Sequence, residues 1–144
     1  IKGLIPGMAV HIGKCCHPLP GERIIGIITT GKGLTVHRVD CQNLEKFNTM
    51  PELWVDIEWG RDQPNIVTAR LEAVLTNRPG SLASVTTQIS QNQGNITNLQ
   101  LVSREEDFFK FFIEVEVNHV RHMTAIIATL RANEAVESVE RAKT

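Results

Sequence analysis

The sequence predicts an α+β chain made of a small β-rich Cys/His unit followed by a unit with the element order β-α-β-β-α-β. Three observations predict this class. Residues 1–47 place closely spaced Gly and Pro around short β-prone runs. Residues 66–144 carry two apolar stripes at helical spacing, set between longer runs of β-prone residues. The segment 61–65 is polar and rich in breakers, so it is the predicted linker.

The first unit is expected to span residues 1–60. Asp40 is the predicted N-cap of a short helix that runs to Phe47, because an Asp side chain accepts hydrogen bonds from unpaired backbone N–H groups. Residues 54–59 alternate with a two-residue period, which predicts a strand. The other strands, each bounded by Gly or Pro, are expected at 8–12, 24–30 and 34–39.

The second unit is expected to span residues 66–144. Its first strand, at 67–75, places Ala69, Leu71, Ala73 and Leu75 on one face. A helix follows with Leu82, Val85 and Ile89 in its apolar stripe, and Gly94 is the predicted residue just past its end. Further strands at 96–103, 108–117 and 136–141 and a helix at 119–132 complete the ferredoxin-like order, with both helices on one face of an antiparallel sheet.

Charge is unevenly distributed along the 144 residues. The net charge is -1, but residues 1–47 hold six Lys and Arg against three Asp and Glu, a local +3, while the remainder holds nine against thirteen, or −4. The basic segment favours a polyanion partner, although a solvated surface explains the same imbalance. No apolar run approaches the length of a membrane span, and three cysteines do not form a secreted disulfide framework. We therefore expect a cytoplasmic protein, and the start at Ile1 indicates a fragment.

The turn at residues 77–82 joins the first strand of the second unit to its first helix. Pro79 presets the backbone for the helix entrance, and Gly80 lets a ligand approach the backbone closely. The N–H groups of Gly80, Ser81 and Leu82 are expected to lack helical partners, so together with the helix dipole they predict a site for a carboxylate. A bare tight connection between strand and helix explains the same residues.

The element order, the Asn-Arg-Pro-Gly-x-Leu turn and the later Gly-Asn-Ile resemble an ACT domain. The resemblance implies a regulatory module that pairs side by side and binds a small amino acid at the junction. It implies that Asn77, Gly80, Ser81 and Leu82 hold the amino acid, and that Asn95 and Ile96, from a partner subunit, complete the pocket. Leu82, Ile96 and Leu99 offer apolar walls, which favours a branched-chain ligand.

Cysteine and histidine recur in the first unit at positions that fit a metal site. Cys15, Cys16, His37 and Cys41 are four candidate ligands of tetrahedral zinc, the only candidate metal, and no cofactor is otherwise expected to be required. The adjacency of Cys15 and Cys16 counts against this set because both sulfurs reach one ion only through a contorted backbone, and His17 or His11 is the alternative ligand. Two other hypotheses explain the same residues: reduced cysteines buried in a small core, and nucleophilic catalysis by a Cys–His pair.

The string CCHPLPGERIIGIITTGKGLTVHRVDC resembles the conserved-cysteine, zinc-finger-like domain (the ribosome-intersubunit domain) of the RelA/SpoT family. That family makes and hydrolyses (p)ppGpp in the stringent response, and in it this domain precedes an ACT domain, the order found here. The resemblance implies a regulatory, non-catalytic fragment whose catalytic domains lie elsewhere in the parent enzyme.

Two functions follow from the resemblance. In the first, the ACT domain senses an amino acid and biases hydrolase against synthetase activity in the catalytic N-terminal domains. In the second, the region is a docking module for ribosomal RNA and tRNA that binds no small molecule. A homodimer through the ACT domain is expected because pairing covers an exposed sheet edge. The expected RNA contacts are Lys14, Arg23, Lys32 and Arg38.

Overall fold

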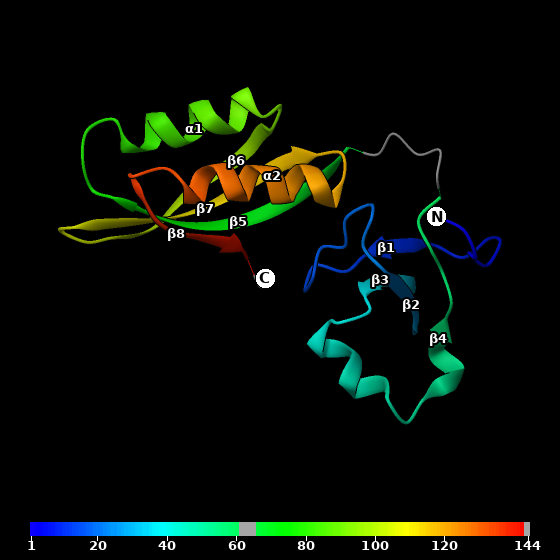
Figure 1. The fold of residues 1–144 in the computed structure, drawn as a ribbon. Helices are drawn as coiled ribbons and strands as arrows, with labels where there is room; N and C mark the ends of the chain where they lie inside the picture. The colour runs from blue at the N-terminus through cyan, green and yellow to red at the C-terminus, as the bar shows by residue number, and fades with distance from the viewer. Residues whose placement is uncertain (61–65, 143–144) are drawn as a thin grey trace. The chain divides into compact units, whose positions relative to one another are not determined.

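The computed structural model describes residues 1–60 and 66–142 of the chain (Figure 1). They divide into two compact units, a first unit within Ile1–Pro64 and a second unit within Asn65–Ala142. The predicted linker at 61–65 lies outside the described residues. Each unit has its own sheet, which agrees with the predicted α+β class.

The first unit is a four-stranded sheet with the order β1-β3-β2-β4. β1 runs parallel to β3, whereas β2 is antiparallel to both β3 and β4. Its elements are β1 (Val10–Ile12), β2 (Ile24–Thr29), β3 (Gly33–Arg38), the 3-10 helices η1 (Gln42–Phe47) and η2 (Pro51–Leu53), and β4 (Trp54–Val55).

The core of the first unit is small. Ile24, Leu34, Val36 and Ile57 form one buried hydrophobic cluster, with partly buried apolar side chains packed around them. Leu19, Ile27 and Leu44 are also buried. A core of this size removes little apolar surface from water, and small units commonly need a metal or another staple. A metal bound in such a unit would therefore add to its stability.

Two predictions in the first unit are wrong. The strand expected at 54–59 is only two residues long, Trp54–Val55. Further along, Glu58 pairs with Lys2 and not with β2. Asp40 does not cap η1, whose N-cap is Cys41 without a side-chain bond. The Asp40 carboxylate instead accepts from Arg38 Nη2 at 2.9 Å, a charge-assisted bond that outcompetes capping.

The second unit is an antiparallel four-stranded sheet with the order β6-β7-β5-β8. Figure 1 shows α1 and α2 together on one face of this sheet, as the ferredoxin-like order predicts. The elements are β5 (Val67–Thr76), α1 (Ser81–Gln91), β6 (Asn95–Arg104), β7 (Phe108–Val117), α2 (Val120–Arg131) and β8 (Val136–Arg141).

Alternation along the central strands builds the core of the second unit. Every second residue of β5 from Ala69 to Leu75 is fully buried, which confirms the predicted inward face. β7 does the same with Ile113 and Val115, while the helices add Val85, Ile89, Met123, Ile126 and Leu130. The two helices thus cover one face of the sheet with apolar side chains.

The end of α1 differs from its prediction in one residue. Gln93, and not Gly94, takes the left-handed conformation after the helix, with φ of 60°. Gly94 is required for space, because a Cβ there would lie 2.8 Å from Ile89 Cγ2 and 2.9 Å from Val115 Cγ1. The glycine lets the chain pass tightly between helix and sheet.

Candidate metal centre and ligand pocket

Cys15, Cys16, His37 and Cys41 converge at one point in the first unit. Their four ligand atoms all lie within 4.8 Å of one another. Cys15 Sγ is 3.4 Å from His37 Nδ1 and 3.5 Å from Cys41 Sγ, and Cys16 Sγ is 3.9 Å from the same histidine nitrogen. Three separate parts of the chain supply the cluster: the loop after β1, the strand β3, and the N-cap of η1.

The loop after β1 turns sharply enough to aim both adjacent cysteines inward. The N–H of His17 donates to the carbonyl of Gly13 at 3.0 Å, and His17 adopts a positive φ of 43°. Gly13 makes room for the histidine ligand, since a Cβ there would lie 2.8 Å from Val36 O and 3.2 Å from His37 Nδ1. The Cys15 and Cys16 sulfurs end 4.0 Å apart. The contortion expected for adjacent ligands is thus present in the backbone.

The cluster has the dimensions of a tetrahedral N/S site. Zinc bonds of about 2.3 Å to sulfur and about 2.05 Å to nitrogen place tetrahedral ligands about 3.8 Å (S to S) and about 3.5 Å (S to N) apart. The three separations from Cys15 and the one from Cys16 to His37 run from 3.4 to 4.0 Å and bracket these values, and all the ligand atoms lie within 4.8 Å of one another. Neither His11 nor His17 is in the group of four. His11 Nε2 instead bonds to the carbonyl of Lys32 at 2.8 Å.

The protonation of the cluster follows from burial and from N–H donors. Burial lowers the pKa of His37, which keeps its ring in the neutral form that ligates metals. Burial raises the pKa of Cys16 to about 12, against a hydrogen bond from the Arg38 N–H. Burial also raises the pKa of Cys41. At Cys15 burial acts in the same direction, but hydrogen bonds from Asn43 and the other cysteines outweigh it and lower the pKa.

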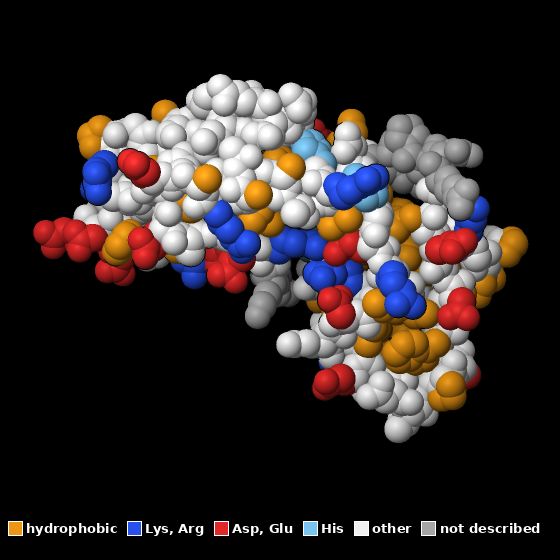
Figure 2. All heavy atoms as spheres, viewed as in Figure 1, with side chains coloured by type: hydrophobic (Ala, Val, Ile, Leu, Met, Phe, Trp, Pro, Cys, Tyr) orange, Lys and Arg blue, Asp and Glu red, His pale blue; other side chains and the backbone are white. Residues whose placement is uncertain are grey.

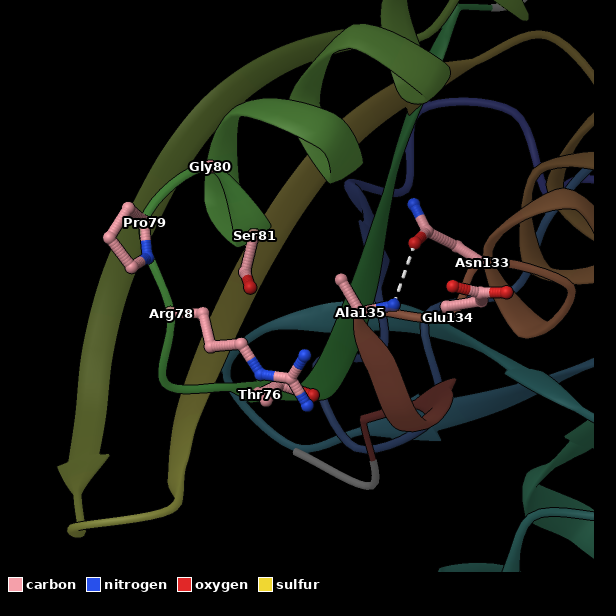
Figure 3. Close-up of a pocket in the computed structure, with 8 residues that line it drawn as sticks. All are labelled: Thr76, Arg78, Pro79, Gly80, Ser81, Asn133, Glu134 and Ala135. Atoms are coloured by element: carbon pink, nitrogen blue, oxygen red, sulfur yellow. Dashed lines mark hydrogen bonds between the residues drawn. The ribbon is translucent and has the colours of Figure 1, made fainter.

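A separate cavity of about 330 Å³ opens in the second unit beside the start of α1. Figure 3 shows the turn from β5 into α1 on one side of it and the turn from α2 into β8 on the other. The first turn contributes Arg78 and Ser81, and the second contributes Asn133 and Glu134. The remaining lining residues are Thr76, Pro79, Gly80 and Ala135.

Ser81 is the buried polar residue of this cavity. The residue as a whole is only 6% exposed, but its hydroxyl oxygen, which makes no hydrogen bond within the described part of the chain, is not among the fully buried polar atoms and stays accessible. Figure 3 shows that hydroxyl pointing into the space above Arg78. That hydroxyl is therefore available to a ligand or to water in the cavity. Of the helix-entrance donors, the Ser81 N–H is already bonded to Arg78 O at 3.2 Å.

The structure separates the residues expected to bind an amino acid. Gly80 and Ser81 line the cavity, while Leu82 does not. The Asn77 side chain turns away and donates to Glu105 O at 2.9 Å. Asn95 and Ile96 lie beyond the other end of α1, whose 11 residues span about 16 Å, so within one chain they cannot meet the cavity.

Comparison with known proteins assigns both units. Residues 1–60 match the RelA/SpoT RIS domain, and residues 64–141 match the ACT domain. The chain belongs to the RelA/SpoT family. It is the RIS–ACT part of the C-terminal regulatory region of such a protein. From here the first unit is called the RIS domain and the second unit the ACT domain.

Relatives match over almost the whole chain. GTP pyrophosphokinase rsh of Brucella ovis is 34% identical over 98% of this chain and 19% of its own length. The bifunctional (p)ppGpp synthase/hydrolase SpoT of Escherichia coli is 28% identical over 98% of this chain and 20% of its own length. The chain thus spans about a fifth of the length of these curated relatives. The ACT domain from GTP pyrophosphokinase of Chlorobium tepidum superposes with a TM-score of 0.48 at 23% identity, over 54% of this chain and all of that one.

The predicted RNA contacts of the RIS domain have unequal surroundings. Lys14, Arg23 and Lys32 are exposed and form no ion pair within the described residues. Arg38 is partly buried between two carboxylates, with Nε 3.1 Å from Glu22 Oε2. In the part of the chain that the structure describes, no helix is long and apolar enough to cross a membrane.

Several residues of both sites escaped the sequence-based prediction. Asn43 hydrogen bonds to Cys15, and its place two residues after Cys41, at a helix start, was the available signal. Arg78 lies inside the predicted turn and lines the cavity, but the prediction assigned binding to the backbone N–H groups of that turn and not to the Arg78 side chain. Asn133 and Glu134 follow α2 and gave no signal, because only the tertiary fold brings their turn to the start of α1.

Proposed function

We propose that this RIS–ACT region reports amino-acid supply to the catalytic domains of a parent (p)ppGpp synthetase/hydrolase, without being catalytic itself. In this proposal the ACT domain binds a free amino acid in the cavity beside α1, and the RIS domain holds zinc in the Cys/His cluster. The observation that carries the sensing role is the accessible Ser81 hydroxyl, which makes no hydrogen bond to the described residues, in a cavity lined by one cationic and one anionic side chain.

The charges around the cavity match the two charged groups of an amino acid. The Arg78 guanidinium, the Ser81 hydroxyl and the positive end of the α1 dipole suit the carboxylate. Glu134, on the opposite turn, suits the ammonium group. Asn133 holds that turn in place, because its Oδ1 accepts from the Ala135 N–H at 2.8 Å.

The cavity favours a small amino acid. Its volume of about 330 Å³ is near the lower limit for small-molecule sites, and Pro79 and Ala135 are the apolar residues of its lining. None of the apolar walls expected for a branched-chain ligand, Leu82, Ile96 and Leu99, lines it. A branched-chain ligand therefore requires a second site, formed where Asn95 and Ile96 of one copy approach the Gly80 turn of another.

Calorimetry with each of the twenty amino acids tests the sensing proposal. We expect one or a few small amino acids to bind, and both Arg78→Ala and Gly80→Arg to abolish the heat. Asn95→Ala separates the two sites: it leaves binding unchanged if the cavity is complete within one chain and removes it if a partner copy completes the pocket. Binding of none of the twenty more tightly than millimolar refutes the sensing role.

Zinc is proposed for the cluster on the strength of its preformed ligand distances. Metal analysis of the purified chain is expected to find one zinc per chain. Cys41→Ser should lose the metal, while His11→Ala, whose histidine lies outside the cluster, should keep it. A metal-free chain that also fails to bind added zinc would leave reduced, partly buried cysteines as the explanation.

A homodimer through the edge of the ACT sheet is part of the proposal. β6 is an edge strand, and Leu101 and Val102 on it are 52% and 56% exposed. Pairing with β6 of a second copy would cover these side chains and satisfy the unpaired strand edge. Light scattering across a concentration series should show the dimer, and Leu101→Lys should shift it to monomer.

A docking role on ribosomal RNA and tRNA is the second candidate function. Its support is the exposed, unpaired set of Lys14, Arg23 and Lys32 in the RIS domain. The ACT domain offers less to phosphates, since α1 carries no charged residue and acidic side chains gather at the β6–β7 turn (Figure 2). Ribosome co-sedimentation over a salt series tests this role. Arg23→Glu and Lys32→Glu should each weaken binding, and indifference to both refutes it.

A further inference from the structure

The two sulfurs of Cys15 and Cys41 stand 3.5 Å apart in the RIS domain. A disulfide needs about 2.05 Å between sulfurs, so the two sulfurs must approach by roughly 1.5 Å. Neither cysteine lies in a strand of the sheet. Both residues are partly exposed, so a small oxidant reaches them. We infer that Cys15 and Cys41 form a peroxide-sensitive disulfide pair, a modification site that excludes metal from the cluster.

The geometry selects Cys41 as the partner of Cys15. Cys16 is the nearer residue in sequence, but its sulfur is 4.0 Å from that of Cys15. A disulfide between adjacent residues also closes a ring through one peptide bond and forces that bond away from planarity, which is costly. Cys16 is further held by the Arg38 N–H, which donates to its sulfur at 3.3 Å. Cys16 therefore stays reduced.

The chemistry consumes one hydrogen peroxide. The Cys15 thiolate attacks a peroxide oxygen, forming an S–O bond as the O–O bond breaks, and the released hydroxide takes a proton to become water. Cys15 is then a sulfenic acid. The Cys41 thiolate attacks that sulfur, an S–S bond forms, and hydroxide leaves and is protonated to a second water. Two thiols and one peroxide thus become one disulfide and two waters.

Oxidation and metal binding use the same sulfurs, so they exclude each other. A disulfide between Cys15 and Cys41 removes two of the four ligand atoms and leaves only Cys16 and His37. A metal held by the cluster is released on oxidation, since two ligands do not complete a tetrahedral site. The inference rests on the sulfur positions and stands whether or not zinc is the resident metal.

The test is peptide mapping of the 144-residue chain after treatment with stoichiometric hydrogen peroxide, with free thiols alkylated before digestion. We expect a crosslinked peptide pair joining Cys15 to Cys41 and an alkylated Cys16. The matched control is Cys16→Ser, which should keep the crosslink, whereas Cys15→Ser and Cys41→Ser should each lose it. The unsubstituted chain alone decides the pairing, so a variant that fails to fold does not compromise the result.

A zinc-loaded sample separates this inference from the proposed zinc site. Peroxide should release one zinc for each crosslink formed, read with a coloured chelator. A crosslink in a chain that never binds zinc refutes the zinc proposal alone. Zinc binding without a Cys15–Cys41 crosslink overturns the disulfide inference, as do a Cys15–Cys16 bond, an intermolecular bond or sulfinic acid as the main product.

Discussion

The RIS and ACT domains hold themselves together in different ways. The ACT domain relies on repetition: alternate residues of β5 and β7 face two helices, and fully buried side chains run along both strands. The RIS domain has fewer buried apolar side chains, four of them in one cluster, and a separate cluster of three cysteines and a histidine. The contrast predicts that the ACT domain keeps its fold without a bound ligand, whereas the RIS domain depends on a metal bound by its Cys/His cluster.

Metal removal is the strongest way to test this difference. Chelation should destabilise the RIS domain by as much as about 10 kcal/mol, because a structural zinc contributes its binding free energy to folding. The ACT domain should be unaffected. Hydrogen exchange measured by mass spectrometry with and without chelator checks this, since protection should fall in residues 1–60 and stay constant in 66–142. Equal protection in both samples would show that the small core is sufficient.

The next largest effect should come from a substitution that leaves a void in the ACT core. Leu71→Ala removes a fully buried side chain of the central strand β5 and should lower the free energy of unfolding by about 2–5 kcal/mol. Ile66→Ala, whose side chain is 70% exposed just before β5 and outside the proposed dimer edge, is the control and should change it by about 0.5 kcal/mol or less. Denaturant unfolding followed by circular dichroism measures both. A similar loss in the two variants would contradict the predicted core.

A smaller effect should follow from the histidine that ties the two helices together. His122 Nδ1 accepts from the Asn118 N–H at 3.2 Å, and Nε2 lies 2.6 Å from the Asn92 carbonyl at the end of α1. His122→Ala leaves both backbone groups without this partner and should cost about 1–3 kcal/mol. Arg121→Ala, an exposed neighbour, should cost little. The same denaturant titration measures the free energy of unfolding of both variants, and equal losses would contradict this role of His122.

The smallest effect expected is the change in zinc affinity of the RIS domain with each unit of pH. The pKa of Cys16 is raised to about 12, so without metal this thiol keeps its proton at neutral pH and must release it to bind zinc. Zinc affinity should therefore rise with pH, about tenfold per pH unit for each proton released. Competition with a metal-sensitive dye at several pH values measures the slope. Zinc affinity that does not change between pH 6 and 8 would contradict this protonation state.

The fold was predictable largely because both domains obey local rules. The burial of Ala69, Leu71, Ala73 and Leu75 follows from alternation alone, and the α1 stripe follows from helical spacing. The Asp40 cap failed because Arg38 competes for the same carboxylate, and the 54–59 strand failed because Lys2 takes Glu58 as its partner. Both failures come from contacts that propensity does not include.

The sequence alone was enough for the α+β class and the β-α-β-β-α-β order, and it named Cys15, Cys16, His37 and Cys41 as candidates with His17 or His11 as the alternative, because periodicity and residue chemistry are local properties. Tertiary structure decided the rest. It brought Cys15, His37 and Cys41 within hydrogen-bonding distance through a Gly13 turn, and it set Glu134 across from Arg78. Such long-range contacts depend on packing, since residues far apart in the chain come together only when the sheets have formed.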